Sequence, residues 1–308
     1  MAEKVDIILA TYNGEKYIVE QLRTILEQSY RNWHLYISDD GSSDNTLALI
    51  DQFIIDNHLF DKVTILPLRK KYNRIGPAFN FSYGLEFSTS KYIMFCDQDD
   101  FWLPEKIHKQ ISKIILLDDD IPALSFCDAS IVDENLVQLF PSFSDYEGFT
   151  WEKSLELQNL IFQNIAPGCC MIFNDKLREL FLSKLTYNNL IMHDWYLIIL
   201  CSAFGNINFE KKPLIKYRQH ESNQVGVTKR FNVFKIRKKL LTSYRNHINA
   251  KKQAKEINEL YNKLNINVQL KELVDSFNLA YHFRLKVLLK MKVKKSSYLK
   301  TLLVYLFI

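Results

Sequence analysis

The sequence predicts an α/β fold in which a mostly parallel central sheet is flanked by helices and is followed by a basic helical extension. Apolar runs typical of buried strands alternate with helical patterns through the first hundred residues. This alternation indicates right-handed β-α-β connections and parallel strands. No strand pattern follows about Arg230, where the composition becomes helical.

Charge divides the chain at the same point. Residues 1–228 carry 21 Lys and Arg against 31 Asp and Glu, a net charge of −10. Residues 229–308 carry 19 Lys and Arg against 4 Asp and Glu, a net charge of +15. We therefore expect an α/β domain over residues 1–228 and a basic α-helical extension over residues 229–308.

Four strands are expected in the first hundred residues, each an apolar run that ends in polar residues. Helices with one apolar face separate them. In the first helix, Ile18, Leu22 and Ile25 recur at the spacing of a buried helical face. The expected strands span 5–10, 33–37, 63–66 and 92–96, and the helices span about 18–26, 45–56 and 77–87.

Beyond Pro104, which favours the start of a helix, strands and helices continue in a less regular order. The expected helices span about 104–117, 151–162, 175–183 and 193–204, and the expected strands span 123–127, 169–173 and 214–217. A polar segment over 218–228 ends this part.

Composition excludes several classes of protein. With 308 residues and 47% hydrophobic content, the chain can bury a large core and is neither disordered nor fibrous. No signal peptide is visible, and no apolar stretch approaches the roughly 20 residues of a membrane-spanning helix. Five cysteines lie in or beside apolar runs without paired metal spacing, as is typical of reduced core residues in a cytosolic protein. They are Cys96, Cys127, Cys169, Cys170 and Cys201.

Three carboxylates, Asp97, Asp99 and Asp100, directly follow the apolar run 92–96. At an effective dielectric of about 20, like charges about 5 Å apart repel by roughly 3 kcal/mol. A divalent cation would turn this repulsion into attraction, and Mg²⁺ and Mn²⁺ favour carboxylate oxygens. The alternative is an acidic turn that leads into a helix at Pro104.

Polar residues also follow the first two expected strands. Tyr12 and Asn13 follow the first strand, and Asp39 and Asp40 follow the second. These ends should meet the acidic residues at the sheet edge where open α/β sheets bind ligands. The Tyr12 ring can stack on a base, and the Asp40 carboxylate can accept the imide N–H of uracil or thymine. An ordinary turn with a helix cap is the alternative for the segment around Asp40.

Three segments together resemble the inverting glycosyltransferases of family 2, which have the nucleotide-diphosphosugar-binding GT-A fold. They are Ile-Leu-Ala-Thr-Tyr-Asn at 8–13, Asp-Asp-Gly-Ser-Ser-Asp at 39–44, and Asp-Gln-Asp-Asp-Phe-Trp-Leu-Pro at 97–104. The resemblance covers about residues 4–225. It implies a nucleotide-diphosphosugar donor and Mg²⁺ or Mn²⁺. It further implies that Ala10, Tyr12 and Asp40 contact the base and ribose, Asp97 the ribose or metal-bound water, and Asp99 the metal.

Two more segments carry the resemblance. Arg74, in Asn-Arg-Ile-Gly, would contact phosphate or nucleotide, and an exposed basic turn is an equal alternative. In Tyr-Arg-Gln-His at 217–220, Arg218 would pair with phosphate and His220 would complete the metal or diphosphate site. A lone histidine is more often a structural residue than a ligand, so both interpretations of His220 stay open.

Asp194 lies at the start of an expected helix, between His193 and Trp195. The resemblance implies that Asp194 is the catalytic base, which takes the proton from the acceptor hydroxyl as this attacks the anomeric carbon. His193, Trp195 and Gly168 would then lie on the acceptor side. The alternatives are a helix cap with a buried tryptophan and a glycine required by packing.

The motifs look most like bacterial rhamnosyltransferases. This implies transfer of L-rhamnose from dTDP-L-rhamnose onto a lipid-linked oligosaccharide in capsule, O-antigen or cell-wall polysaccharide synthesis. UDP-glucose, UDP-galactose or a UDP-N-acetylhexosamine are alternative donors. A catalytically inactive nucleotide- or lipid-binding module is the alternative of another class.

The basic extension mixes apolar and cationic residues at near-helical spacing, as in Lys286, Leu288 and Lys290. Such helices can lie in the headgroup layer of an anionic membrane. We therefore expect a cytoplasmic protein that associates peripherally with the inner face of the membrane, where it meets a lipid-linked glycan acceptor. Packing on the α/β domain alone is the first alternative, and nucleic acid, a second alternative, is not expected as a partner.

Overall fold

The computed structural model describes residues 3–68, 76–184, 192–220, 248, 250–252, 254–259 and 270–307. Arg74 and the expected boundary at 228 lie outside the described residues. So does the first basic segment of the extension, at 231–239.

Four parallel strands form the N-terminal half of the sheet, in the order β3-β2-β1-β4. They are β1 (Val5–Thr11), β2 (Trp33–Asp39), β3 (Val63–Ile65) and β4 (Tyr92–Asp97). In the register of these strands, Thr11 lies opposite Asp39 and Ala10 lies opposite Asp97. The carboxyl ends of β1, β2 and β4 therefore meet at one edge, as the sequence predicted.

The second half of the sheet is mixed. β8 (Met171–Asn174) runs antiparallel to β4 and to β6 (Ala123–Val132), and β9 (Asn206–Arg218) runs parallel to β6. β5 (Phe101–Trp102) pairs with β9, and β7 (Gln138–Phe140) pairs with β6, both antiparallel. Within the described residues these strands complete one nine-stranded sheet.

Helices cover both faces because side chains alternate along each strand. In β1, Val5, Ile7 and Leu9 face a core shared with α1, α2 and α4, whereas Ile8 and Ala10 face a core shared with α3, α7, α8 and α9. The helices are α1 (Ile18–Leu26), α2 (Thr46–Asp56), α3 (Pro77–Phe87), α4 (Lys106–Ile114), α5 (Phe143–Glu147), α6 (Trp151–Ser154), α7 (Leu157–Leu160), α8 (Asp175–Lys184) and α9 (His193–Phe204). The predicted α/β class is confirmed.

Several element boundaries differ from those expected. The last strand spans Asn206–Arg218 rather than 214–217, and a register shift at Asp128 accommodates Pro213, which has no N–H to donate. The expected strand at 169–173 begins only at Met171, because Gly168–Cys170 form a 3₁₀ turn, η1. The expected helix at 151–162 is broken into α6 and α7. The short strands β5 and β7 were not predicted.

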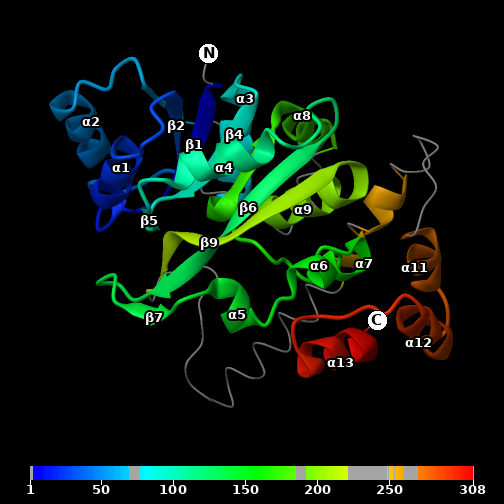
Figure 1. Ribbon diagram of the computed structural model, residues 1–308. Coiled ribbons are helices and arrows are strands. Elements are labelled where there is room, and N and C mark those ends of the chain that lie inside the picture. The colour runs from blue at the N-terminus through cyan, green and yellow to red at the C-terminus, as the bar shows by residue number, and fades with distance from the viewer. Residues whose placement is uncertain are drawn as a thin grey trace.

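The described part of the extension packs on the α/β part. Helices α11 (Leu270–Ser276), α12 (Tyr281–Lys290) and α13 (Tyr298–Phe307), orange to red in Figure 1, lie beside α6 and α7 and away from α1 and α2. Leu288 and Val304 are buried in the same core as α7 and α9. The backbone N–H of Lys294 donates to Asn159 Oδ1 over 2.7 Å. Among the described residues, no helix combines the length and apolar character needed to cross a membrane.

Candidate active site

Gln98 joins the loop after β1 to the acidic residues after β4. Its Oε1 accepts hydrogen bonds from Thr11 Oγ1 at 2.7 Å and from the Tyr12 N–H at 2.9 Å, and its Nε2 donates to the Tyr12 carbonyl at 3.1 Å. A Cβ at Gly14 would lie 2.3 Å from Gln98 Oε1, so only glycine leaves this side chain in place. Gln98 was not predicted as a site residue, although its place between Asp97 and Asp99 is a signal that could have found it.

Three residues predicted to contact the nucleotide lie together at this edge. Ala10 is buried at the end of β1, and Tyr12 and Asp40 are partly exposed. The N–H of Asp40 donates to the Thr11 carbonyl at 2.9 Å, and Asp40 Oδ2 accepts from the Gly76 N–H at 2.8 Å. Asp40 therefore ties the end of β2 to the start of α3.

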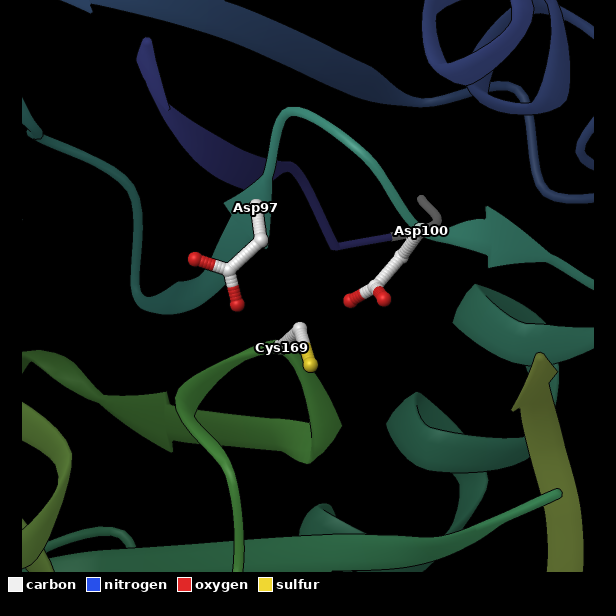
Figure 2. A group of neighbouring side chains, drawn as sticks. All are labelled: Asp97, Asp100 and Cys169. Atoms are coloured by element: carbon white, nitrogen blue, oxygen red, sulfur yellow. The ribbon is translucent and has the colours of Figure 1, made fainter. Parts of the chain in front are cut away.

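Asp97 and Asp100, which share the segment at the end of β4, converge with Cys169 of η1 (Figure 2). One ligand atom from each side chain lies within 4.8 Å of the other two. Asp100 Oδ1 accepts from the Arg218 N–H at 3.2 Å, which joins the acidic turn to the end of β9. Its Oδ2 is buried without a hydrogen-bond partner among the described residues.

These acids hold protons more strongly than ordinary carboxyl groups. Burial raises the pKa of Asp97 to about 7, and the charges of Asp99 and Asp194 add to the effect. Burial, with the charges of Asp99 and Asp97, also holds the pKa of Asp100 well above its usual range. A nearby cation would favour the ionised forms, because it offsets both causes.

Asp99 and His220 form the pair that fits a divalent metal. Asp99 Oδ2 and His220 Nε2 lie 2.8 Å apart, with 19% and 10% of the respective side chains exposed. Carboxylates suit Mg²⁺ or Mn²⁺. A cation bound here would offset the like charges that raise the pKa of Asp97, and it would satisfy the Asp100 oxygen that has no partner among the described residues. The residues present therefore fit the expected metal.

Arg218 occupies a buried position at the end of β9. Its Nε donates to the Asp99 carbonyl at 2.7 Å, and its terminal nitrogens contact the Glu134 carbonyl and the Glu20 carboxylate. The guanidinium carbon lies 4.5 Å from the Tyr17 ring centroid, a cation–π contact. Arg218 thus holds the acidic turn, and neither Glu20 nor Tyr17 was predicted to take part.

Asp194 lies buried in the first turn of α9 beside Gly168. Its Oδ2 accepts from the Gly168 N–H at 3.1 Å, and its Oδ1 accepts from the Trp195 N–H at 2.6 Å. Burial raises the pKa of Asp194 to about 6, although these N–H groups and the Asn164 side chain oppose the rise. The charge of Asp194 also acts on Asp97, so the structure brings the two acids predicted from distant segments into one site.

The neighbours of Asp194 differ in their contacts. His193 is buried, stacks on Phe81 with ring centroids 4.1 Å apart, and has no hydrogen-bond partner at either ring nitrogen among the described residues. Burial lowers the pKa of His193 to about 3, so the ring is neutral. A Cβ at Gly168 would lie 2.8 Å from His193 Nε2, which makes this approach dependent on glycine. Trp195 donates its indole N–H to the Leu160 carbonyl at 2.6 Å and anchors α9 to α7.

Known proteins of one family resemble this chain in sequence. The sequence profile of Glycosyl transferase family 2 matches residues 6–181. The dTDP-rhamnosyl transferase RfbG of Shigella flexneri is 30% identical over 272 residues, which cover 85% of this chain and 88% of that protein. The UDP-Glc:alpha-D-GlcNAc-diphosphoundecaprenol beta-1,3-glucosyltransferase WfgD of Escherichia coli is 27% identical over 71% of this chain and 78% of its own length.

Solved structures agree at the level of the fold. The mannosyltransferase PcManGT of Pyrobaculum calidifontis, in complex with GDP-Man and Mn²⁺, superposes with a TM-score of 0.53 at 14% identity over 99% of this chain and 87% of that one. Residues 1–349 of S. aureus TarS superpose with a TM-score of 0.51 at 16% identity over 92% of this chain and 80% of that one. The chain therefore belongs to glycosyl transferase family 2, and it is a GT-A enzyme that transfers a sugar from a nucleotide-sugar donor.

Proposed function

We propose that the enzyme transfers L-rhamnose from dTDP-L-rhamnose, with inversion, onto a lipid-linked oligosaccharide in surface polysaccharide synthesis. The observation that carries this proposal is the match to a dTDP-rhamnosyl transferase at 30% identity over 85% of the chain. That match covers most of both chains, a larger share of this chain than the 6–181 that the family profile matches.

Asp194 is the proposed catalytic base. Its carboxylate would accept the proton of the acceptor hydroxyl as the oxygen attacks the anomeric carbon opposite the leaving diphosphate. A pKa of about 6 supports this role, because the carboxylate is ionised near neutral pH and still basic enough to take a proton. The Gly168 N–H, at 3.1 Å, orients the carboxylate. Direct displacement needs no covalent sugar–enzyme intermediate.

Asp99 and His220 are the proposed holders of Mg²⁺ or Mn²⁺, with Asp97 beside them. The ion, when bound, offsets charge on the departing diphosphate. Ala10, Tyr12 and Asp40 are proposed to receive the base and ribose. In this arrangement Gln98 keeps the nucleotide loop and the acidic turn in register, because it bonds to Thr11 and Tyr12.

The decisive experiment is a donor panel with purified enzyme, Mn²⁺ and lipid-linked acceptor extracted from membranes. We expect radiolabel from dTDP-L-rhamnose to enter lipid and Asp194→Asn to abolish transfer while it retains nucleotide binding. Asp175→Asn, in α8 and outside the site, is the matched control and should retain activity. Full transfer by Asp194→Asn would reject the assignment of the base.

UDP-glucose is the second candidate donor, because the relative WfgD is named for that sugar nucleotide. If label from UDP-glucose enters lipid and label from dTDP-L-rhamnose does not, the proposed donor becomes UDP-glucose. The proposed roles of the site residues would not change. Binding of both nucleotides with no product from any donor would favour an inactive binding module.

We further propose that the enzyme works at the cytoplasmic face of the membrane and that α12 and α13 contact anionic lipid. Phe283, Leu289 and Tyr298 are exposed there, and exposed Lys286 and Lys292 lie on the same segment. Apolar rings with lysines suit the headgroup layer. In sedimentation with vesicles of phosphatidylglycerol, Lys286→Glu with Lys292→Glu should reduce binding, and Lys109→Glu, on α4, should not. Equal binding by the double variant would reject this surface.

A further inference from the structure

The loop that joins α12 to α13 docks on α7 through two side chains. The Lys294 N–H donates to Asn159 Oδ1 at 2.7 Å. The Ser296 N–H donates to Gln163 Oε1 at 2.8 Å, and Gln163 Nε2 returns a hydrogen bond to Ser296 Oγ at 2.8 Å. The Gln163 N–H donates to the Asn159 carbonyl at 3.1 Å, so the helical turn continues to Gln163 and puts both side chains on one face.

The residues that directly follow these two side chains hold the start of α9. The Leu160 carbonyl accepts the indole N–H of Trp195 at 2.6 Å. The Asn164 side chain hydrogen-bonds to Asp194 and lowers its pKa, which opposes the effect of burial. One helical turn therefore contacts the basic extension at two positions and the proposed catalytic base and its neighbour at the next two.

The position of this turn depends on such contacts, because α7 spans only Leu157–Leu160 and so short a helix has little stability of its own. The docking loop is itself held by α5 on its other side. Lys300 Nζ lies 2.5 Å from Glu147 Oε2. A Cβ at Gly148 would lie 2.9 Å from the Ser296 carbonyl oxygen, so glycine permits this close approach. The loop is thus a fixed support on which α7 can rest.

We propose that Asn159 and Gln163 are positioning residues for the transfer step, which dock residues 294–296 on α7 and so hold Asp194 in place to take the acceptor proton. The proposal rests on the proposed role of Asp194 as the base. A displacement of about 1 Å between reacting groups can slow a reaction by about a hundredfold. The nucleotide-binding edge is built from the ends of β1, β2 and β4, so nucleotide binding should be unaffected.

Gln163→Met tests the role in transfer, because it removes both hydrogen bonds to Ser296 and retains the length of the side chain. With dTDP-L-rhamnose and extracted lipid-linked acceptor, kcat should fall by at least about tenfold, and the Kd for dTDP should change by less than about twofold. Gln163→Glu keeps the acceptor for the Ser296 N–H and should recover most of kcat. Ser296→Ala, on the other side of the contact, should lower kcat in the same direction. Urea unfolding fixes a temperature at which each variant is folded.

Hydrogen exchange of the Gly168 amide tests the positioning without any donor, because this N–H donates to Asp194 Oδ2 at 3.1 Å. Gln163→Met should speed its exchange by about tenfold, as expected for the loss of about one hydrogen bond. The matched control is Glu272→Gln, which removes the ion pair with Lys290 inside the extension and should leave the exchange rate and kcat at wild-type values.

Two results for Gln163→Met would overturn the proposal: an unchanged exchange rate at Gly168, or faster exchange with an unchanged kcat. If the wild-type enzyme transfers sugar from no donor, the proposed function is rejected instead. The exchange rates of the variant and the control would still decide whether the docked loop holds Asp194 and Gly168 together.

Discussion

Asp194 combines burial with hydrogen bonds that favour its ionised form, and the balance places its pKa near 6. As the proposed base, Asp194 must be unprotonated to work, so kcat/KM for the acceptor should fall by about tenfold per pH unit below about pH 6 and be level above it. A pH–rate profile from pH 5 to 8 at saturating donor and Mn²⁺ measures this. Asp194→Glu should shift the pH at which the rate falls on the acid side. If the variant and the wild type have the same profile, another group causes that fall.

Asp97 makes metal-free stability depend on pH. Its pKa rises from 3.8 to about 7 on folding, so the folded state binds the proton more strongly than the unfolded state. The resulting contribution to the free energy of unfolding is lost as pH rises through about 7. Asp97→Asn removes the titration. At pH 8 the free energy of unfolding of the variant should exceed that of the wild type by up to roughly 4 kcal/mol, and by less where Asp97 contacts water. At pH 4 the two free energies should differ little. Urea unfolding of both proteins without metal at pH 4 and pH 8 measures the difference in free energy of unfolding. The same difference at both pH values would contradict an effect of Asp97 ionisation.

At the scale of elements, the site depends on strand ends that are held together by a few polar side chains. Gln98 connects the ends of β1 and β4, Asp40 connects β2 to α3, and Arg218 connects β9 to the acidic turn. Each of these side chains bonds to the backbone of another element. The strand ends therefore keep their spacing before any ligand arrives.

Arg218 offers the test of this element-level role. Arg218→Met removes hydrogen bonds to two carbonyls and the Glu20 carboxylate, and should lower the free energy of unfolding by roughly 3 kcal/mol. Glu20→Gln keeps an acceptor and should cost less than about 1 kcal/mol. Urea unfolding of both variants measures this. An unchanged stability with a raised KM for donor would instead indicate that Arg218 contacts phosphate.

At the scale of the whole molecule, α12 and α13 combine a buried face with an exposed one. Val304 is fully buried in the core shared with α9, and Tyr298 is 98% exposed. Deleting the extension would remove part of that core, so a truncated protein cannot separate packing from membrane binding. Single substitutions on the two faces can.

Val304→Ala should lower the free energy of unfolding by about 2 kcal/mol and leave vesicle binding unchanged. Tyr298→Ala should change stability by less than about 0.5 kcal/mol and weaken binding to anionic vesicles. Thermal unfolding and vesicle sedimentation of both variants check the pair. Loss of vesicle binding in Val304→Ala, at a temperature where the variant stays folded, would contradict the assignment of packing to one face and membrane binding to the other.

Much of the fold could be predicted because strands and helices of the N-terminal half leave strong local patterns. Residues 7–10 and 92–96 are continuous apolar runs that are followed by polar residues, and Ile18 with Leu22 marks a helical face. The second half was predicted less well. The strand at 206–218 contains three lysines and a proline and is recognisable only through its pairing with β6.

For the site, the sequence alone identified the candidate acids. The run Asp97-Gln98-Asp99-Asp100 and the separate Asp194 named the acids, because residue type and position after a strand or at a helix start are local properties. Only the tertiary structure decided the partners: Asp99 with His220, Asp100 with Arg218 and Cys169, and Asp194 with Gly168. Such contacts join residues up to 121 positions apart, and they depend on strand order and turn geometry that no local pattern encodes.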